Sequence, residues 1–249
     1  YYGTASRNVT VLTGIQNAAQ GKARVMYSEG CDLWREYSDH GVSMLSEALI
    51  VAKHSDVVVL VLGLDWRLEG EQGDNNNFNA SGDKYNLMLP PVQQELMEKI
   101  LEVGKPTIVL LMAGSAVDVS YAQEKASAVL LPWYPGAGGG DAVADILFGK
   151  VSPSGKLPLT FYYNEALAEM PDFTDYSMRN RTYRYYTGTP LYPFGYGLSY
   201  TSFTYTDMAV VYNQETDQFE VTVTVTGGDV VSAELTAEST TVRPGSEAF

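Results

Sequence analysis

The chain has 249 residues, of which 45% are hydrophobic and 18% are charged, and its formal net charge is −14. This length is sufficient for one large hydrophobic core and a second small module. A negative field repels phosphate backbones and anionic lipid surfaces, so the composition argues against nucleic acid and membranes as partners. In addition, no apolar run approaches the roughly 20 residues that a membrane-spanning helix needs.

Residue types that bind metals are scarce. Cys31 is the only cysteine, and His40 and His54 are the only histidines. An internal disulfide is therefore excluded, and a cysteine- or histidine-based zinc site is not expected. The acidic stretch 74–83 lacks the spacing of a calcium-binding EF-hand. We therefore predict a protein without a metal or cofactor.

The chain starts at Tyr1, without an initiator Met or a signal peptide. We therefore expect it to be part of a longer gene product. The sequence does not define a compartment, although a periplasmic or secreted location is compatible with it.

Short apolar runs alternate with helical patterns over the first 163 residues. In chain order they predict a strand at 23–27, a helix at 42–53, a strand at 56–62, a helix at 91–103, a strand at 107–112, a helix at 116–124, a strand at 128–131, a helix at 141–148 and an edge strand at 157–162. The run 56–62 is almost entirely apolar and β-branched, which is typical of a parallel strand buried on both faces. This alternation predicts an α/β fold with a doubly wound, mostly parallel sheet flanked by helices.

The character of the sequence changes after this region. We divide the chain into an α/β sandwich domain at 1–163, an irregular Tyr/Arg-rich connector packing on it at 164–200, and a β segment at 201–249. In the last part, residues 202–212 and 218–226 alternate like antiparallel strands. A complete immunoglobulin-like sandwich takes about 100 residues, so we expect only a partial, fibronectin-like β-sandwich.

The loop after the strand at 56–62 concentrates charged and aromatic side chains. It contains four acids, one arginine and one tryptophan: Asp65, Trp66, Arg67, Glu69, Glu71 and Asp74. In α/β folds of this type, ligands bind beyond the carboxyl ends of the strands. Glycosidases need a carboxylic acid that protonates the leaving oxygen, and an aromatic ring can stack on a sugar. Taken alone, however, the same composition also describes an ordinary solvated acidic loop.

A series of motifs in fixed order extends over residues 1–205. They are Leu68–Asp74 (LEGEQGD), Ser81–Lys84 (SGDK), Leu87–Pro90 (LMLP), Gln93–Leu96 (QQEL), Val109–Gly114 (VLLMAG), Trp133–Gly136 (WYPG), Ala142–Gly149 (AVADILFG), Ser152–Pro158 (SPSGKLP), Arg181–Tyr185 (RTYRY) and Pro193–Tyr200 (PFGYGLSY). With these motifs, the chain resembles glycoside hydrolase family 3, and in particular its β-xylosidase-like branch.

The resemblance implies a retaining β-glycosidase that hydrolyses terminal β-linked xylose or glucose, in which a TIM-like barrel domain supplies an Asp nucleophile. The α/β domain would supply the acid/base Glu, which in the family's motif lies three residues before an Asp. Glu71 and Asp74 have this spacing, so Glu71 is the first candidate and Glu69 the second. We also expect Trp66, Asp74, Trp133 and Tyr134 to line the substrate site.

Two departures from the family pattern limit the assignment. Asp74 is followed by Asn75, where the family often has Arg, and an Asp-Lys pair appears only later, at Asp83 and Lys84. No barrel and no nucleophile segment are found in the chain, so we expect it to be inactive alone, as one part of an enzyme. The alternatives are a non-catalytic carbohydrate-binding or scaffold domain and, as the weakest, a nucleotide binder that uses the glycine-rich turn 136–140.

Overall fold

The computed structural model describes residues 4–35, 44–71, 83–227 and 233–236, the last of these by their backbone alone. The chain divides into two compact units. Residues 1–151 and 155–197 form the first unit, and residues 152–154 and 198–249 form the second.

A parallel three-stranded sheet is the centre of the first unit. Its strands are β1 (Val58–Gly63), β2 (Thr107–Met112) and β3 (Ala128–Leu130), in the order β1-β2-β3. Leu60 lies opposite Val109, and Leu110 lies opposite Leu130. The prediction of a parallel sheet flanked by helices is therefore confirmed.

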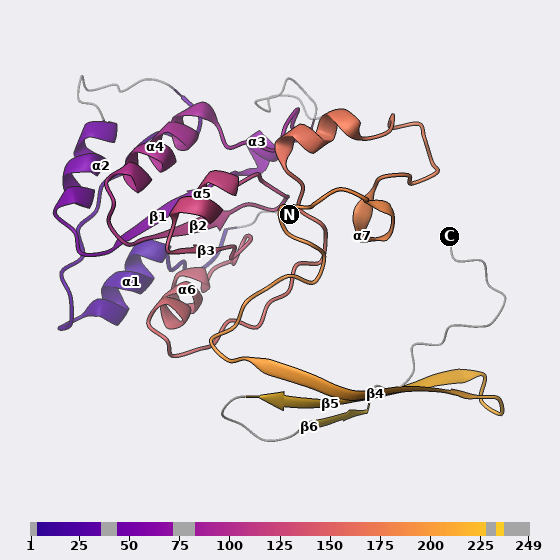
Figure 1. The fold of residues 1–249 in the computed structure, drawn as a ribbon. Helices are drawn as coiled ribbons and strands as arrows, with labels where there is room; N and C mark the ends of the chain where they lie inside the picture. The colour runs from indigo at the N-terminus through magenta and orange to yellow at the C-terminus, as the bar shows by residue number, and fades with distance from the viewer. Residues whose placement is uncertain (1–3, 36–43, 72–82, 228–232, 237–249) are drawn as a thin grey trace. The chain divides into compact units, whose positions relative to one another are not determined.

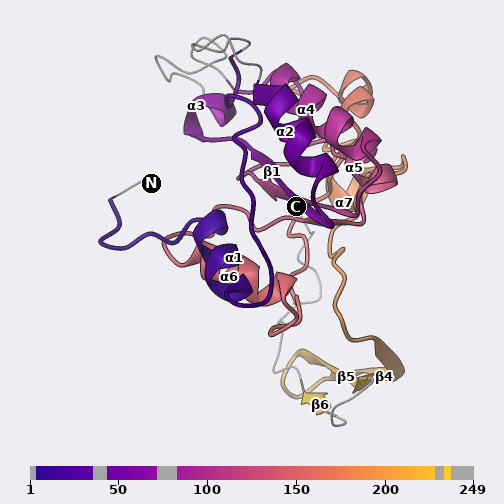
Figure 2. The same ribbon diagram turned by 90° about the vertical axis from the view of Figure 1, so that its left-hand side faces the viewer.

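Helices cover both faces of this sheet (Figures 1 and 2). Side chains of β2 alternate between the two faces, as the two-residue period of a strand requires. Val109 and Leu111 pack in a core cluster with residues of α2 (Met44–Lys53), α4 (Pro91–Glu102) and α5 (Ser120–Lys125). Leu110 packs on the opposite face in a second cluster, with residues of α1 (Val11–Ala19) and α6 (Gly139–Leu147).

Three short helices complete the first unit. They are α3 (Trp66–Glu69), which directly follows β1, the 3-10 helix η1 (Asn164–Glu169) and α7 (Thr182–Tyr185). The buried Asp118 carboxylate anchors the start of η1, because its Oδ2 accepts a hydrogen bond of 2.7 Å from the Asn164 backbone N–H. The Asn164 side chain in turn accepts a hydrogen bond of 2.9 Å from the Leu87 N–H.

The α1 and α6 helices cross at very short range. A Cβ atom built on Gly14 would lie 2.0 Å from the carbonyl oxygen of Gly140, so only glycine fits in α1 at this point. A nucleotide binder was expected to use the glycine-rich turn 136–140. In the structure, Gly140 instead contacts another helix, and its N–H donates to the Val9 carbonyl at 3.0 Å.

The second unit contains one antiparallel sheet. Its strands are β4 (Phe203–Asn213), β5 (Gln218–Gly227) and β6 (Ala233–Thr236), in the order β4-β5-β6. The side chains of β4 are exposed over nearly its whole length. Within the described residues, the second unit contains no other sheet, so a fibronectin-like sandwich remains a prediction.

Two expected strands are not formed. Residues 23–27 are not a strand, because no backbone hydrogen bond within the described residues joins them to β1. Residues 157–162 contribute only an isolated antiparallel bridge between Phe161 and Tyr192, since the connector pairs with them briefly. In both segments the apolar pattern was present, but a neighbouring strand in register was not.

Within the described residues, none of the helices combines the length and apolarity needed to cross a membrane. The same residues contain no group of three or more His, Cys, Asp or Glu side chains arranged to hold a metal ion.

Candidate functional site

The carboxyl end of β1 is fixed by a buried glutamine. The Gln93 Oε1 atom accepts a hydrogen bond of 2.8 Å from the Gly63 N–H, and its Nε2 atom donates to the carbonyls of Gly63 and Leu33, each at 2.8 Å. A Cβ atom at Gly63 would lie 1.9 Å from the Met112 carbonyl oxygen, so β1 and β2 approach closely here because residue 63 is glycine. The position at which the loop leaves the sheet is therefore tightly defined.

Helix α3 begins immediately beyond this point. Asp65 is its N-cap residue, and its carboxylate accepts hydrogen bonds from the N–H groups of Arg67 at 2.9 Å and Leu68 at 3.3 Å. The Arg67 guanidinium also pairs with the Asp65 carboxylate at 2.6 Å, and it lies 4.6 Å from the centre of the Trp34 ring. Such capping satisfies N–H groups that a short helix cannot satisfy itself. Asp65 and Arg67 thus have structural roles in the loop.

Glu69 ends α3, and its carboxylate is surrounded by hydrogen-bond donors. Oε1 accepts from the Gly114 N–H at 2.9 Å and from the Ser115 hydroxyl at 2.7 Å. Oε2 accepts from the Tyr134 hydroxyl at 2.6 Å. We call Glu69, Gly114, Ser115 and Tyr134 the Glu69 cluster. The cluster connects the segments that follow β1, β2 and β3.

Lys84 lies beside this cluster. Its ammonium group donates a hydrogen bond of 2.9 Å to the Ala116 carbonyl. Burial lowers the pKa of Lys84, and the nearby negative charge of Glu69 partly opposes that effect. Burial, followed by the hydrogen bond to Glu69, raises the pKa of Tyr134. The Tyr134 hydroxyl therefore remains a protonated donor throughout the neutral range.

Glu71 differs from Glu69 in its surroundings. Gly70, with φ of 60°, is the C-cap residue of α3. Glu71 follows it, is exposed, and makes no hydrogen bond or ion pair with any other residue that the structure describes. A carboxyl group of this kind can exchange protons with a molecule that approaches from solvent. Asp74, expected at the same site, lies outside the described residues.

The structure distributes the expected aromatic residues over different environments. Trp66 is 41% exposed on α3. Tyr134 belongs to the Glu69 cluster, whereas Trp133 packs against the core and meets Phe161 edge-on, with ring centroids 6.2 Å apart. Trp133 also has a positive φ of 54°, which directs these two neighbouring side chains differently.

Sequence reasoning missed Ser115, Lys84 and Trp34 as contributors to this region. Ser115 immediately follows the VLLMAG motif at the end of β2, and Lys84 belongs to the SGDK motif, so the signal in each case was the motif. Trp34 is close to the loop only in three dimensions, and no local pattern pointed to it.

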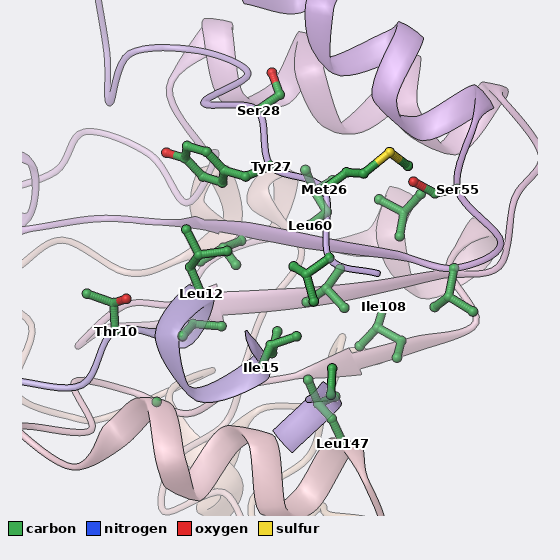
Figure 3. A pocket seen from close by; sticks show the side chains of 18 of the residues that line it. Thr10, Leu12, Ile15, Met26, Tyr27, Ser28, Ser55, Leu60, Ile108 and Leu147 are labelled. Atoms are coloured by element: carbon green, nitrogen blue, oxygen red, sulfur yellow. The ribbon is translucent and has the colours of Figure 1, made fainter. Parts of the chain in front are cut away.

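A cavity of about 1520 Å³ lies between α1, residues 22–30 and the edge of the sheet, and Tyr134 of the Glu69 cluster is among its lining residues. The side chains seen in Figure 3 include those of Leu12, Ile15, Leu60, Ile108 and Leu147. The lining also contains polar side chains, among them those of Thr10, Tyr27, Ser28 and Ser55.

Comparison with known proteins gives consistent matches. The sequence profile of the Glycosyl hydrolase family 3 C-terminal domain matches residues 1–200. A beta-xylosidase of Formosa agariphila is 38% identical over 210 residues, which cover 82% of this chain and 27% of that protein. A periplasmic beta-glucosidase of Salmonella typhimurium is 33% identical, with 84% of this chain and 29% of that protein covered.

The solved structure of a family 3 beta-glucosidase from Bifidobacterium adolescentis is similar in fold, with a TM-score of 0.75 and 32% sequence identity. That alignment covers 91% of this chain and 33% of the other. The chain thus spans less than a third of the length of the two curated relatives.

Proposed function

Because this chain belongs to glycoside hydrolase family 3, as its C-terminal domain, we propose that it supplies the acid/base residue of a retaining β-glycosidase and that this residue is Glu71. The observation that carries the proposal is the contrast between two glutamates on one loop. Glu71 is an exposed carboxyl just beyond the end of β1, whereas both oxygens of its neighbour Glu69 already accept hydrogen bonds.

The proposed reaction has two steps, in which Glu71 acts in opposite directions. In the first, the Glu71 carboxyl donates its proton to the glycosidic oxygen while the bond from that oxygen to the anomeric carbon breaks. A nucleophilic carboxylate forms the glycosyl ester. In the second, the Glu71 carboxylate takes a proton from a water molecule, whose oxygen attacks the anomeric carbon and releases the nucleophile.

The nucleophile belongs to a partner domain in this proposal. We propose that it is an Asp on a TIM-like barrel domain of the same enzyme. The two carboxyl groups would then lie about 5–5.5 Å apart, the separation that retaining glycosidases use. The proximity of a second carboxylate also raises the pKa of a general acid into the range in which it works. The isolated chain is expected to have no turnover, because it carries one half of the pair.

The substrates are proposed from the relatives. Two of them are named beta-xylosidase and periplasmic beta-glucosidase. We therefore propose terminal β-linked xylose or glucose as the sugar that is released.

Replacing Glu71 by Gln in the full-length enzyme tests the proposal. We expect kcat for a p-nitrophenyl β-xyloside or β-glucoside to fall by about 10²–10⁴-fold, the usual contribution of a general acid/base. Dinitrophenyl glycosides need little protonation of the leaving group, so their first step should be spared. Azide, a nucleophile that needs no general base, should then restore turnover and yield a glycosyl azide.

Glu95→Gln is the matched control, because it makes the same chemical change at an exposed position of α4. It should leave kcat unchanged. Wild-type kinetics for Glu71→Gln, or an azide effect in the control, would refute the assignment. Sugar binding without hydrolysis by the full-length wild-type protein would favour the alternative of a non-catalytic carbohydrate-binding domain.

A further inference from the structure

We propose that Glu69 is a positioning residue, whose carboxylate joins the ends of three parallel strands and thereby fixes the place of Glu71 relative to the sheet. This inference rests on the proposed function of Glu71. It assigns the second glutamate of the loop a role that is distinct from proton transfer.

The donors to Glu69 come from distant parts of the chain. Gly114 and Ser115 follow β2 and are 45 and 46 residues away, and Tyr134 follows β3 and is 65 residues away. Glu69 itself lies six residues beyond the end of β1 at Gly63. A single carboxylate thus holds three loops together at the edge of the sheet where ligands bind in α/β folds.

The fit around the carboxylate is tight. A Cβ atom added to Gly114 would lie 2.6 Å from a ring carbon of Tyr134 and 2.8 Å from the Glu69 Oε2 atom. Residue 114 must therefore be glycine for this arrangement to form. Because three donors hold it, the carboxylate has little freedom to move, and the short Gly70 link passes this constraint to Glu71.

Lys84 provides a second attachment to the same turn. Its hydrogen bond goes to the carbonyl of Ala116, the residue that follows the two β2-side donors of the cluster. The Lys84 pKa also responds to the charge of Glu69, which places the two groups within electrostatic reach. Glu69, which precedes Glu71 in the chain, and Lys84, which follows it, are therefore both hydrogen-bonded to residues 114–116.

These contacts also argue against Glu69 as the proton donor. Three hydrogen bonds of 2.6–2.9 Å already occupy most of the roughly four lone-pair sites of this carboxylate, which leaves little room for a proton and a glycosidic oxygen. Hydrogen bonds to charged groups are among the stronger ones in proteins. Glu71 has no such competition within the described residues.

Kinetics of the full-length enzyme separate positioning from proton transfer. In Glu69→Gln, we expect kcat/KM for a p-nitrophenyl glycoside to fall about 10–100-fold, because a displacement of about 1 Å can cost two orders of magnitude. The alkaline limb of the pH profile should persist, because Glu71 is still present, and azide should have no effect. Tyr134→Phe removes one of the three donors and should show a smaller loss of the same kind. All rates are expressed per active site, and the concentration of active sites is determined by titration.

Backbone amide exchange tests the geometry independently of turnover. The Gly114 N–H should exchange about tenfold faster in Glu69→Ala than in the wild type, because its hydrogen bond to a carboxylate is lost. The Gly70 amide, which donates to the Trp66 carbonyl at 3.0 Å, should follow it. The amides of β2 should not change, and Glu95→Gln should match the wild type at all of these sites.

The outcomes are distinct. Suppose that Glu69→Gln loses the alkaline limb of the pH profile and is rescued by azide, and that Glu71→Gln shows neither effect. Glu69 would then be the acid/base, and both proposals would be overturned. Wild-type kcat per active site in Glu69→Gln, with only a lower Tm, would overturn the positioning role alone. If the wild-type enzyme hydrolyses no β-glycoside, the proposed function fails. Unchanged exchange at Gly70 would separately refute the constraint on the loop.

Discussion

Gln93 offers a sharp test of how the carboxyl end of β1 is held in place. Its side chain is 2% exposed and makes three hydrogen bonds of 2.8 Å, two to Gly63 and one to Leu33. We consider the change Gln93→Leu, which preserves approximate volume but removes all three bonds. The N–H and carbonyl of Gly63 and the carbonyl of Leu33 would then lose a partner in a largely buried environment.

The expected cost follows from those groups. Leaving a buried polar group unsatisfied costs about 1–3 kcal/mol, and the apolar side chain recovers part of that through burial. We therefore expect the free energy of unfolding to fall by about 3 kcal/mol. Urea denaturation, followed by tryptophan fluorescence and by circular dichroism, measures this change as a lower transition midpoint.

Gln94→Leu is the matched control on the same helix. Gln94 donates one hydrogen bond of 2.8 Å to Glu98, and its buried Oε1 atom has no partner within the described structure. Removing that oxygen offsets the lost bond, so we expect a change within about 1 kcal/mol. Equal midpoints for the two variants would refute the reasoning that Gln93 fixes the end of β1.

Two further predictions concern helix packing and the single thiol. Gly14→Ala should lower the free energy of unfolding by about 1–3 kcal/mol, because its Cβ would lie 2.0 Å from the Gly140 carbonyl oxygen. The control is Gly155→Ala, whose Cβ would meet nothing within 4 Å and which should be nearly neutral in the same denaturation assay. Burial, with added repulsion from nearby acids, raises the pKa of the Cys31 thiol from 9.0 to about 11. The folded state therefore holds this proton more tightly than the unfolded state, so stability should be complete below pH 9 and fall as the pH rises towards 11. Cys31→Ala should flatten that fall, and an equal fall in the variant would contradict the prediction.

Much of the α/β unit could be predicted because its signals are local. The β-branched run in β1 and the Pro-to-Gly limits of α4 identified both elements within a few residues. Residues 23–27 carry a similar apolar pattern but form no strand. A strand needs hydrogen bonds from a neighbour, and a local pattern contains no information on whether that neighbour comes within reach.

The sequence alone determined the family resemblance, the parallel sheet with its helices, and the loop on which the two candidate glutamates lie. It could not distinguish the surroundings of Glu69 and Glu71, because the two differ by only two positions and share the same chemistry. Their surroundings differ only in the tertiary structure, where donors 45 to 65 residues away converge on Glu69 and leave Glu71 exposed. The physical reason is that hydrogen bonding depends on distances in space, which only the packing of β1, β2 and β3 side by side creates.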